Sequence, residues 1–137
     1  MSDAETVLRR YFDALNKRDY DAVAGAFADE CEYVSVASGA RFSGPASVVH
    51  GLREFSEAFP DWRVELGAVI SSPTIVAAEW RTSGTQDGLF RGRPATGYRF
   101  RRDGCAVAEV ADGRITRYRD YYDRVTLLEQ LGLAPVL

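Results

Sequence analysis

Asp120 is the carboxylate best placed for acid–base chemistry, because of the residues that alternate with it. It lies in the segment 105–123, CAVAEVADGRITRYRDYYD, between Tyr118 and Tyr122. A carboxylate among aromatic side chains loses solvation of its charged form, so its pKa is expected to rise. A raised pKa suits a general acid or base, and tyrosine hydroxyls nearby can donate to a developing oxyanion. We therefore predict that Asp120 is catalytic; the alternative is that it holds a tyrosine or arginine in a structural network.

The strand pairing around Asp120 depends on the length of the loop at 111–113. A two-residue loop would place Glu109 on the face of Asp120, whereas a three-residue loop, with Gly113 left-handed, would place small residues there. Charge favours the three-residue loop, because residues of opposite sign then face each other on the other side. In that register the charged face carries Glu109, Arg117, Arg119 and Asp123. The Asp120 face carries Ala106, Ala108, Val110, Tyr118 and Tyr122, and we predict that it forms the floor of a pocket.

Length, composition and charge are those of an ordinary globular protein. The 137 residues predict one domain, 1–137, with 46% apolar residues and a net charge of −3. No basic run, long apolar run or signal-like N-terminus occurs, so we expect a cytoplasmic protein with no nucleic-acid or membrane partner. Cys31 and Cys105 lack metal-ligand spacing, and His50 is the single histidine. No glycine-rich phosphate loop occurs, and we expect neither a metal nor a cofactor.

The first sixty residues show helical periodicity. Ser2 and Glu5 fit a capping box before a helix whose apolar stripe is Val7, Leu8, Tyr11, Phe12 and Leu15. Asp19 is predicted to cap a second helix that runs to about Phe27, and Pro45 to begin a third. The third helix should bury Val48, Leu52, Phe55 and Phe59 and leave His50 solvated. Between these helices, 31–37 is predicted as a strand and 38–44 as a loop.

The remaining residues alternate as β-strands do. In 62–70 the inward residues are predicted to be Trp62, Val64, Leu66, Ala68 and Ile70, and in 74–86 they are Val76, Ala78, Trp80 and Thr82. A glycine-rich loop, 86–97, precedes a long strand that we expect to bend at a bulge at Asp103-Gly104. A short helix, 123–131, ends the chain. This order predicts an α+β fold, a cone-shaped barrel with three N-terminal helices on a strongly curved, mostly antiparallel sheet.

Four motifs carry a family resemblance. They are FPDW at 59–62, W-x-x-x-G-T at 80–85, G-x-P-A-T-G at 92–97 and DGRI…RDYYD…LLEQLG from 112 to 132. In their order and spacing the chain resembles the SnoaL-like polyketide cyclases, in the nuclear-transport-factor-2-like superfamily with ketosteroid isomerase. The run 118–121 is also similar to the aromatic-Arg-Asp-Tyr segment of limonene epoxide hydrolase. In both families the aspartate of this strand acts as acid or base, which implies that role for Asp120.

Other catalytic positions of these families are occupied differently here. Gln86 stands where SnoaL-like sequences often have histidine, and Ala106 lies near a histidine position of the aldol-closing cyclases. Trp80 and Thr82 lie near the place where the epoxide hydrolases have an arginine and a second aspartate. The resemblance implies a cofactor-independent cyclase or isomerase for a hydrophobic, polyketide-like or terpenoid molecule. Epoxide opening, small-molecule binding without turnover and a dimeric interaction domain with a packed cavity are the alternatives.

We predict that aromatic side chains form most of the substrate site. The predicted substrate-binding residues are Tyr33, Phe59, Trp62, Trp80, Gln86, Phe90, Tyr118 and Tyr122. Five arginines lie near the loop, Arg91, Arg93, Arg99, Arg101 and Arg102; we interpret them as solvated, with attraction of an anionic or polyphenolic ligand as the alternative. A homodimer is expected through the face with Glu109, Arg117 and Arg119, since relatives commonly dimerise through the sheet and broad sheet faces tend to be covered.

Overall fold

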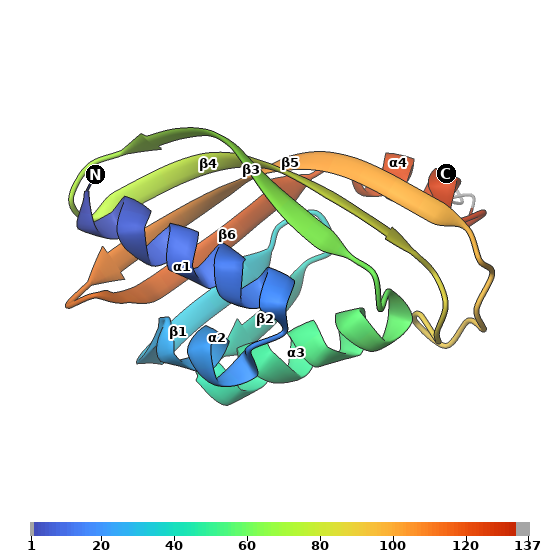
Figure 1. The fold of residues 1–137 in the computed structure, drawn as a ribbon, viewed down its shortest axis with the longest axis horizontal. Coiled ribbons are helices and arrows are strands. Elements are labelled where there is room, and N and C mark those ends of the chain that lie inside the picture. Colours follow the sequence, from blue (N-terminus) through green and yellow to red (C-terminus); the bar gives the residue numbers. More distant parts are fainter. Residues whose placement is uncertain (1, 134–137) are drawn as a thin grey trace.

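A computed structural model describes residues 2–133, in which a curved sheet arches over three helices (Figure 1). The helices α1, α2 and α3 all lie on the concave side, and α4 lies at the far end of the sheet beside β5. The elements are α1 (Asp3–Lys17), α2 (Tyr20–Gly25), β1 (Phe27–Ser35), β2 (Ala40–Ser43), α3 (Pro45–Ala58), β3 (Arg63–Ser71), β4 (Ile75–Thr85), β5 (Arg99–Ala111), β6 (Arg114–Tyr122) and α4 (Arg124–Gln130).

The strand order is β2-β1-β6-β5-β4-β3, and among the described strands only the β1–β6 pair is parallel. This confirms the predicted α+β fold with a mostly antiparallel sheet. The sheet is open, with β2 and β3 as its edges, so it is not a closed barrel. The helices cover one face, and the space between them and the sheet contains the core.

The three predicted N-terminal helices are present. The Ser2 side chain accepts a hydrogen bond from the Glu5 amide at 3.1 Å and caps α1. The whole apolar stripe of α1 is buried, and α1 packs across β3, β4, β5 and β6. His50 on α3 is exposed, as predicted, and lies 3.0 Å from Glu54. Within residues 2–133, no helix has the length and apolar character needed to cross a membrane.

Two predicted boundaries near β1 are wrong. The second helix ends at Gly25, and Phe27 begins β1 with its side chain buried. The segment 38–44, predicted as a loop, contains β2, which pairs antiparallel with β1. The pairing places Phe42 beside Tyr33, and the two rings lie 5.8 Å apart. Four residues are too short a run to show a clear period in sequence.

In β3 the predicted alternation fails after Leu66. Leu66 pairs with Trp80 and Val69 pairs with Ala78, so three steps along β3 match two along β4. This extra residue is a β-bulge, and it reverses the faces of the residues that follow. Val69 therefore packs on the core, whereas Ile70 is 79% exposed, contrary to the inward position predicted for it. Ala68, also predicted to face inward, is exposed.

The β5–β6 hairpin has the predicted faces but a different turn. Asp112 and Gly113, with φ of 52° and 75°, form a two-residue loop between Ala111 and Arg114. The extra residue lies in β6 instead, where Thr116 bulges between the partners of Val110 and Glu109. The bulge restores the register in which small residues face the Asp120 side of the sheet. The three-residue loop was wrong, and the predicted distribution of faces is confirmed.

The long strand β5 has no bulge at Asp103-Gly104. Its pairing with β4 runs without a shift, with Asp103 opposite Arg81 and Gly104 opposite Trp80. A Cβ atom on Gly104 would lie 2.6 Å from Cη2 of Trp80. The glycine therefore gives room to the indole and does not interrupt the alternation of the strand.

Candidate functional site

A cavity of about 600 Å³ lies between the concave face of the sheet and the helices α1, α3 and α4. This volume falls in the range of small-molecule pockets. Most of its wall is aromatic or aliphatic: Tyr11, Phe12, Leu15, Tyr33, Phe42, Val48, Leu52, Phe55, Trp62, Val64, Trp80, Leu89, Phe90, Tyr118, Tyr122, Leu127 and Leu128. The polar groups inside it include Asp120, Arg102, Thr82 and Ser35. The site thus combines a large apolar volume with a few charged or hydroxyl groups.

The Asp120 carboxylate on β6 is held by two donors, one from the adjacent strand β1 and one from β4, which is separated from β6 by β5. The Tyr33 hydroxyl of β1 donates to Oδ2 at 2.9 Å, and Nε1 of Trp80 on β4 donates to Oδ1 at 2.9 Å. Ala106 lies opposite Asp120 on β5, between the strands that carry Asp120 and Trp80, and its side chain is small. Each carboxylate oxygen keeps a further acceptor position, because an ionised carboxylate has about four lone-pair sites.

Burial raises the pKa of Asp120 above its ordinary value of 3.8 and is the largest influence on it. Hydrogen bonds from Tyr33 and Trp80 favour the charged form and lower the pKa, as does the charge of Arg102, but burial prevails. The group is therefore more basic than an exposed aspartate while its charged form still has fixed partners. This combination is suited to proton transfer.

Three tyrosine rings form a cluster around Asp120. Tyr33 stacks on Tyr118 with ring centroids 4.6 Å apart, and Tyr11 meets Tyr118 edge-on at 5.4 Å. Burial, and next the charge of Asp120, raise the pKa of Tyr11, Tyr33 and Tyr118 well above 10.0. These hydroxyls therefore remain protonated near neutral pH and can act as hydrogen-bond donors.

Arg102 projects from β5 into an aromatic part of the same cavity. Its Nε donates to the Thr82 hydroxyl at 3.0 Å. Its Cζ lies 4.2 Å from the centroid of the Tyr122 ring and 5.4 Å from that of Trp80. The Tyr122 hydroxyl is 3.1 Å from Oγ of Ser35, which fixes the ring beneath the guanidinium. The sequence interpretation of Arg102 as a solvated charge is therefore wrong.

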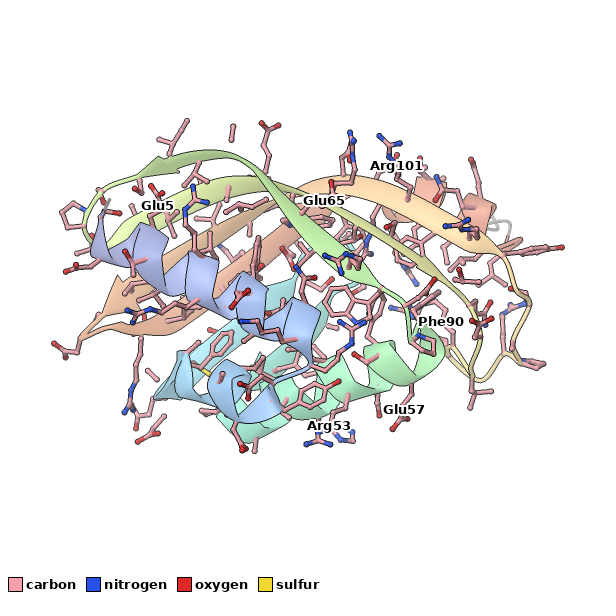
Figure 2. All side chains as sticks on the ribbon, in the orientation of Figure 1. Glu5, Arg53, Glu57, Glu65, Phe90 and Arg101 are labelled. Atoms are coloured by element: carbon pink, nitrogen blue, oxygen red, sulfur yellow. The ribbon has the colours of Figure 1, made fainter. Side chains whose placement is uncertain are left out.

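Six of the eight predicted binding residues line the cavity, and two do not. Tyr33, Trp62, Trp80, Phe90, Tyr118 and Tyr122 line it. Phe59 is fully buried behind the wall, where it packs on Phe90 and Phe100. Gln86 is 1% exposed and binds the loop that follows it: its Nε2 donates to the Pro94 carbonyl at 3.2 Å and its Oε1 accepts from Thr96 at 2.7 Å. That loop carries Phe90 to the end of α3, as Figure 2 shows.

Sequence reasoning missed Tyr11 and Arg102 as members of the site. Tyr11 lies on the apolar stripe of α1, a position that the helical period assigns to the core. Arg102 is four residues from Ala106 on one strand, and the period of two places both on the concave face. The bulge expected at Asp103-Gly104 concealed this relationship. Without that bulge, the alternation alone would have placed Arg102 inside.

An open, strongly curved sheet around three helices, with an aspartate in the cavity, defines a class of cone-shaped α+β proteins. The chain belongs to the SnoaL-like polyketide cyclase family, whose model matches residues 5–131. A search among curated proteins finds no match. Membership of this family agrees with the α+β fold described above.

Solved structures of the same fold include proposed cyclases and an epoxide hydrolase. A proposed polyketide cyclase from Xanthomonas campestris is 25% identical with a TM-score of 0.81, over 94% of this chain and 96% of that one. An LEH-like epoxide hydrolase from M. tuberculosis is 25% identical with a TM-score of 0.77, over 94% and 89%. IdmH from Streptomyces antibioticus, also a proposed polyketide cyclase, is 22% identical with a TM-score of 0.82, over 94% and 98%.

Proposed function

We propose that this protein is a cofactor-independent cyclase or isomerase in which Asp120 acts as general base on a hydrophobic carbonyl compound. The observation that carries the proposal is the Asp120 carboxylate, which lines an apolar cavity with a pKa raised by burial. Membership of the SnoaL-like polyketide cyclase family supports the same reaction class. A homodimer is part of the proposal, since broad sheet faces tend to be covered.

The chemistry begins with the removal of a proton from a carbon next to a carbonyl group. Asp120 accepts the proton, and the electrons of the C–H bond move to the carbonyl oxygen to give an enolate. Donors preorganised around the oxygen lower the barrier, because they stabilise charge that develops in the transition state. The protonated hydroxyl of Tyr11 lines the same cavity and is the candidate donor, whereas the hydroxyl of Tyr118 interacts with Asp120 itself. The enolate then attacks a second carbonyl, whose oxygen takes the proton back from Asp120, or it regains that proton at another carbon.

Epoxide opening is the second candidate, and the likeness to the M. tuberculosis epoxide hydrolase favours it. In that reaction water attacks an epoxide carbon as the ring C–O bond breaks, and Asp120 takes the proton that the water loses and returns it to the ring oxygen, which gives a diol. The aromatic wall suits a hydrophobic epoxide as well as a hydrophobic ketone. Water labelled with ¹⁸O distinguishes the two reactions, because only epoxide hydrolysis places the label in a diol.

The test uses deuterium exchange, which reports proton abstraction without requiring the natural substrate. Wild type and Asp120→Asn are incubated with 2-tetralone in D₂O, and the deuterium entering the carbon next to the carbonyl is followed by NMR. In parallel, styrene oxide is incubated in ¹⁸O-labelled water and the diol is analysed by mass spectrometry. Asp120→Asn should slow the catalysed reaction by about 10²–10⁴, the usual contribution of general acid–base catalysis.

Asp103→Asn is the matched control, because it makes the same chemical change outside the cavity. Asp103 is exposed and receives a 2.8 Å hydrogen bond from Arg81. Its variant should retain the wild-type rate. Equal rates for Asp120→Asn and wild type would contradict the mechanism, and a cavity that binds ligands without any turnover would identify a binding module.

A further inference from the structure

We propose that Arg102 binds an anionic oxygen of the ligand, so that the substrate is an apolar ring compound bearing a carboxylate or a 1,3-dicarbonyl enolate. This inference rests on the proposed function in one respect: the ligand occupies the same cavity. It does not require Asp120 to be the base. The shared chemistry of the two ligand types is a pair of neighbouring oxygens that carry negative charge.

The Arg102 guanidinium is oriented but mostly unused. It lies on β5 directly opposite Thr82 on β4, and its Nε donates to the Thr82 hydroxyl at 3.0 Å. A guanidinium has five N–H donors, so four remain at the two terminal nitrogens. Among residues 2–133, no side chain accepts from those nitrogens and no carboxylate forms an ion pair with them. Each unbonded terminal nitrogen of Arg102 keeps some solvent-accessible surface, and the residue lines the cavity.

Aromatic rings hold this charge on several sides. The Cζ atom lies 4.2 Å from the Tyr122 ring centroid, 5.4 Å from Trp80, 5.5 Å from Phe55 and 5.6 Å from Phe100. Cation–π contacts of this kind stabilise a guanidinium and restrict its motion. A partly desolvated charge still favours a counter-charge, and the planar fork matches two oxygens of one carboxylate. A bidentate anion would complete the site.

Trp80 links this candidate anion site to Asp120. Its Nε1 donates to Oδ1 of Asp120 at 2.9 Å, while its ring also contacts the guanidinium of Arg102. The positive charge of Arg102 is also close enough to the carboxylate to lower the pKa of Asp120. A ligand with its anionic oxygens on Arg102 therefore presents its adjoining carbon atoms to the region next to the carboxylate.

Isothermal titration calorimetry with three naphthyl probes tests the inference. The probes are 2-naphthoate, its neutral methyl ester, and 1-(2-naphthyl)butane-1,3-dione. Wild type should bind 2-naphthoate about 10- to 100-fold more tightly than the ester, since hydrogen bonds to a charged group add that much. Arg102→Gln should abolish the preference and leave the affinity for the ester unchanged. The affinity for the dione should be measured across the pH range in which it ionises. An affinity that rises with ionisation in wild type, but not in Arg102→Gln, would identify the enolate as the ligand form.

Arg101→Gln is the matched control. Arg101 is the preceding residue of β5, and its exposed side chain lies on the side of the sheet away from α1, α2 and α3 (Figure 2). This variant should keep the wild-type preference, and Arg102→Lys should keep part of it. The ratio of the affinities for 2-naphthoate and its ester is measured on wild-type protein alone. A variant that fails to fold therefore cannot affect this part of the test. Asp120→Asn should retain the anion preference, so failure of the proposed catalysis is distinguishable from failure of this inference.

Two results would overturn the assignment. One is wild-type protein that binds 2-naphthoate no better than its ester, or does not bind it. The other is Arg102→Gln protein that folds normally and keeps the preference for the acid.

Discussion

The Tyr33 hydroxyl donates to Oδ2 of Asp120 at 2.9 Å, although the two residues are 87 positions apart in the chain. Parallel pairing of β1 and β6 places Ser35 beside Asp120 and Tyr33 beside Tyr118 on the concave face. The bond lowers the pKa of Asp120, while burial raises it. The basicity of the carboxylate is therefore a balance between burial and donors from other strands.

Tyr33→Phe should make Asp120 a stronger base that works over a narrower pH range. The substitution removes a hydrogen bond that favours the ionised form, so the pKa of Asp120 should rise further. If the ionised form is the base, the acidic limb of the pH–rate profile should move to higher pH. Deuterium exchange into 2-tetralone measured across pH checks the shift. An acidic limb that stays at its wild-type pH would show that this bond does not control the carboxylate.

The stability of the protein should depend on pH through Asp120. Its folded-state pKa is raised above the ordinary 3.8, so the folded state binds the proton more tightly than the unfolded chain. The stability that this provides is fully present below pH 3.8 and is lost as pH rises through the folded-state pKa. Asp120→Asn cannot ionise and should lack this loss. Thermal unfolding is measured at a series of pH values. The melting temperature of Asp120→Asn should increase relative to that of wild type as pH rises. A difference in melting temperature that does not change with pH would contradict the prediction.

Gly104→Ala should destabilise the protein and displace Trp80. The added Cβ would lie 2.6 Å from Cη2 of Trp80 and 2.6 Å from the carbonyl oxygen of Tyr121. Overpacking of this kind costs about 1–3 kcal/mol. Chemical denaturation measures the loss, and the NMR signal of the Trp80 indole N–H reports its bond to Asp120. Gly25→Ala is the control, because its Cβ would meet nothing within 4 Å. Similar stability of the two variants would exclude close packing at Gly104.

The protein should form a homodimer through the outer face of the sheet. Glu109 there binds Arg119 at 2.9 Å and lies 3.8 Å from Arg117, and Tyr121 of the same face is 42% exposed. Light scattering at micromolar concentration should give twice the monomer mass. Tyr121→Glu should shift the mass toward the monomer, whereas Tyr98→Glu, which alters another exposed tyrosine, should not. A monomer mass for wild type would contradict the prediction.

The sequence by itself determined the helical stripes, the long strands and the face of Asp120. Each depends on local periodicity: the stripe of α1 repeats as a helix does, and Tyr118, Asp120 and Tyr122 repeat as a strand does. Charge pairing across the hairpin identified the correct faces even though the turn was different. The bulges between Leu66 and Val69 and at Thr116 escaped prediction, because the residue types of a strand do not show where an extra residue is inserted.

Only the tertiary structure decided which side chains share the cavity. Tyr33, Trp80 and Asp120 come from three strands, and their hydrogen bonds depend on strand order and register, which distant pairing sets. The environment of Arg102 likewise needs aromatic rings from α3, β4, β5 and β6, and no local pattern encodes them. Phe59 and Gln86 are the opposite case. Their places in the sequence motifs predict a role in substrate binding, but the packing of the folded chain puts both behind the residues that line the cavity. Burial and partner distance are properties of the folded chain, because contacts between distant segments create them.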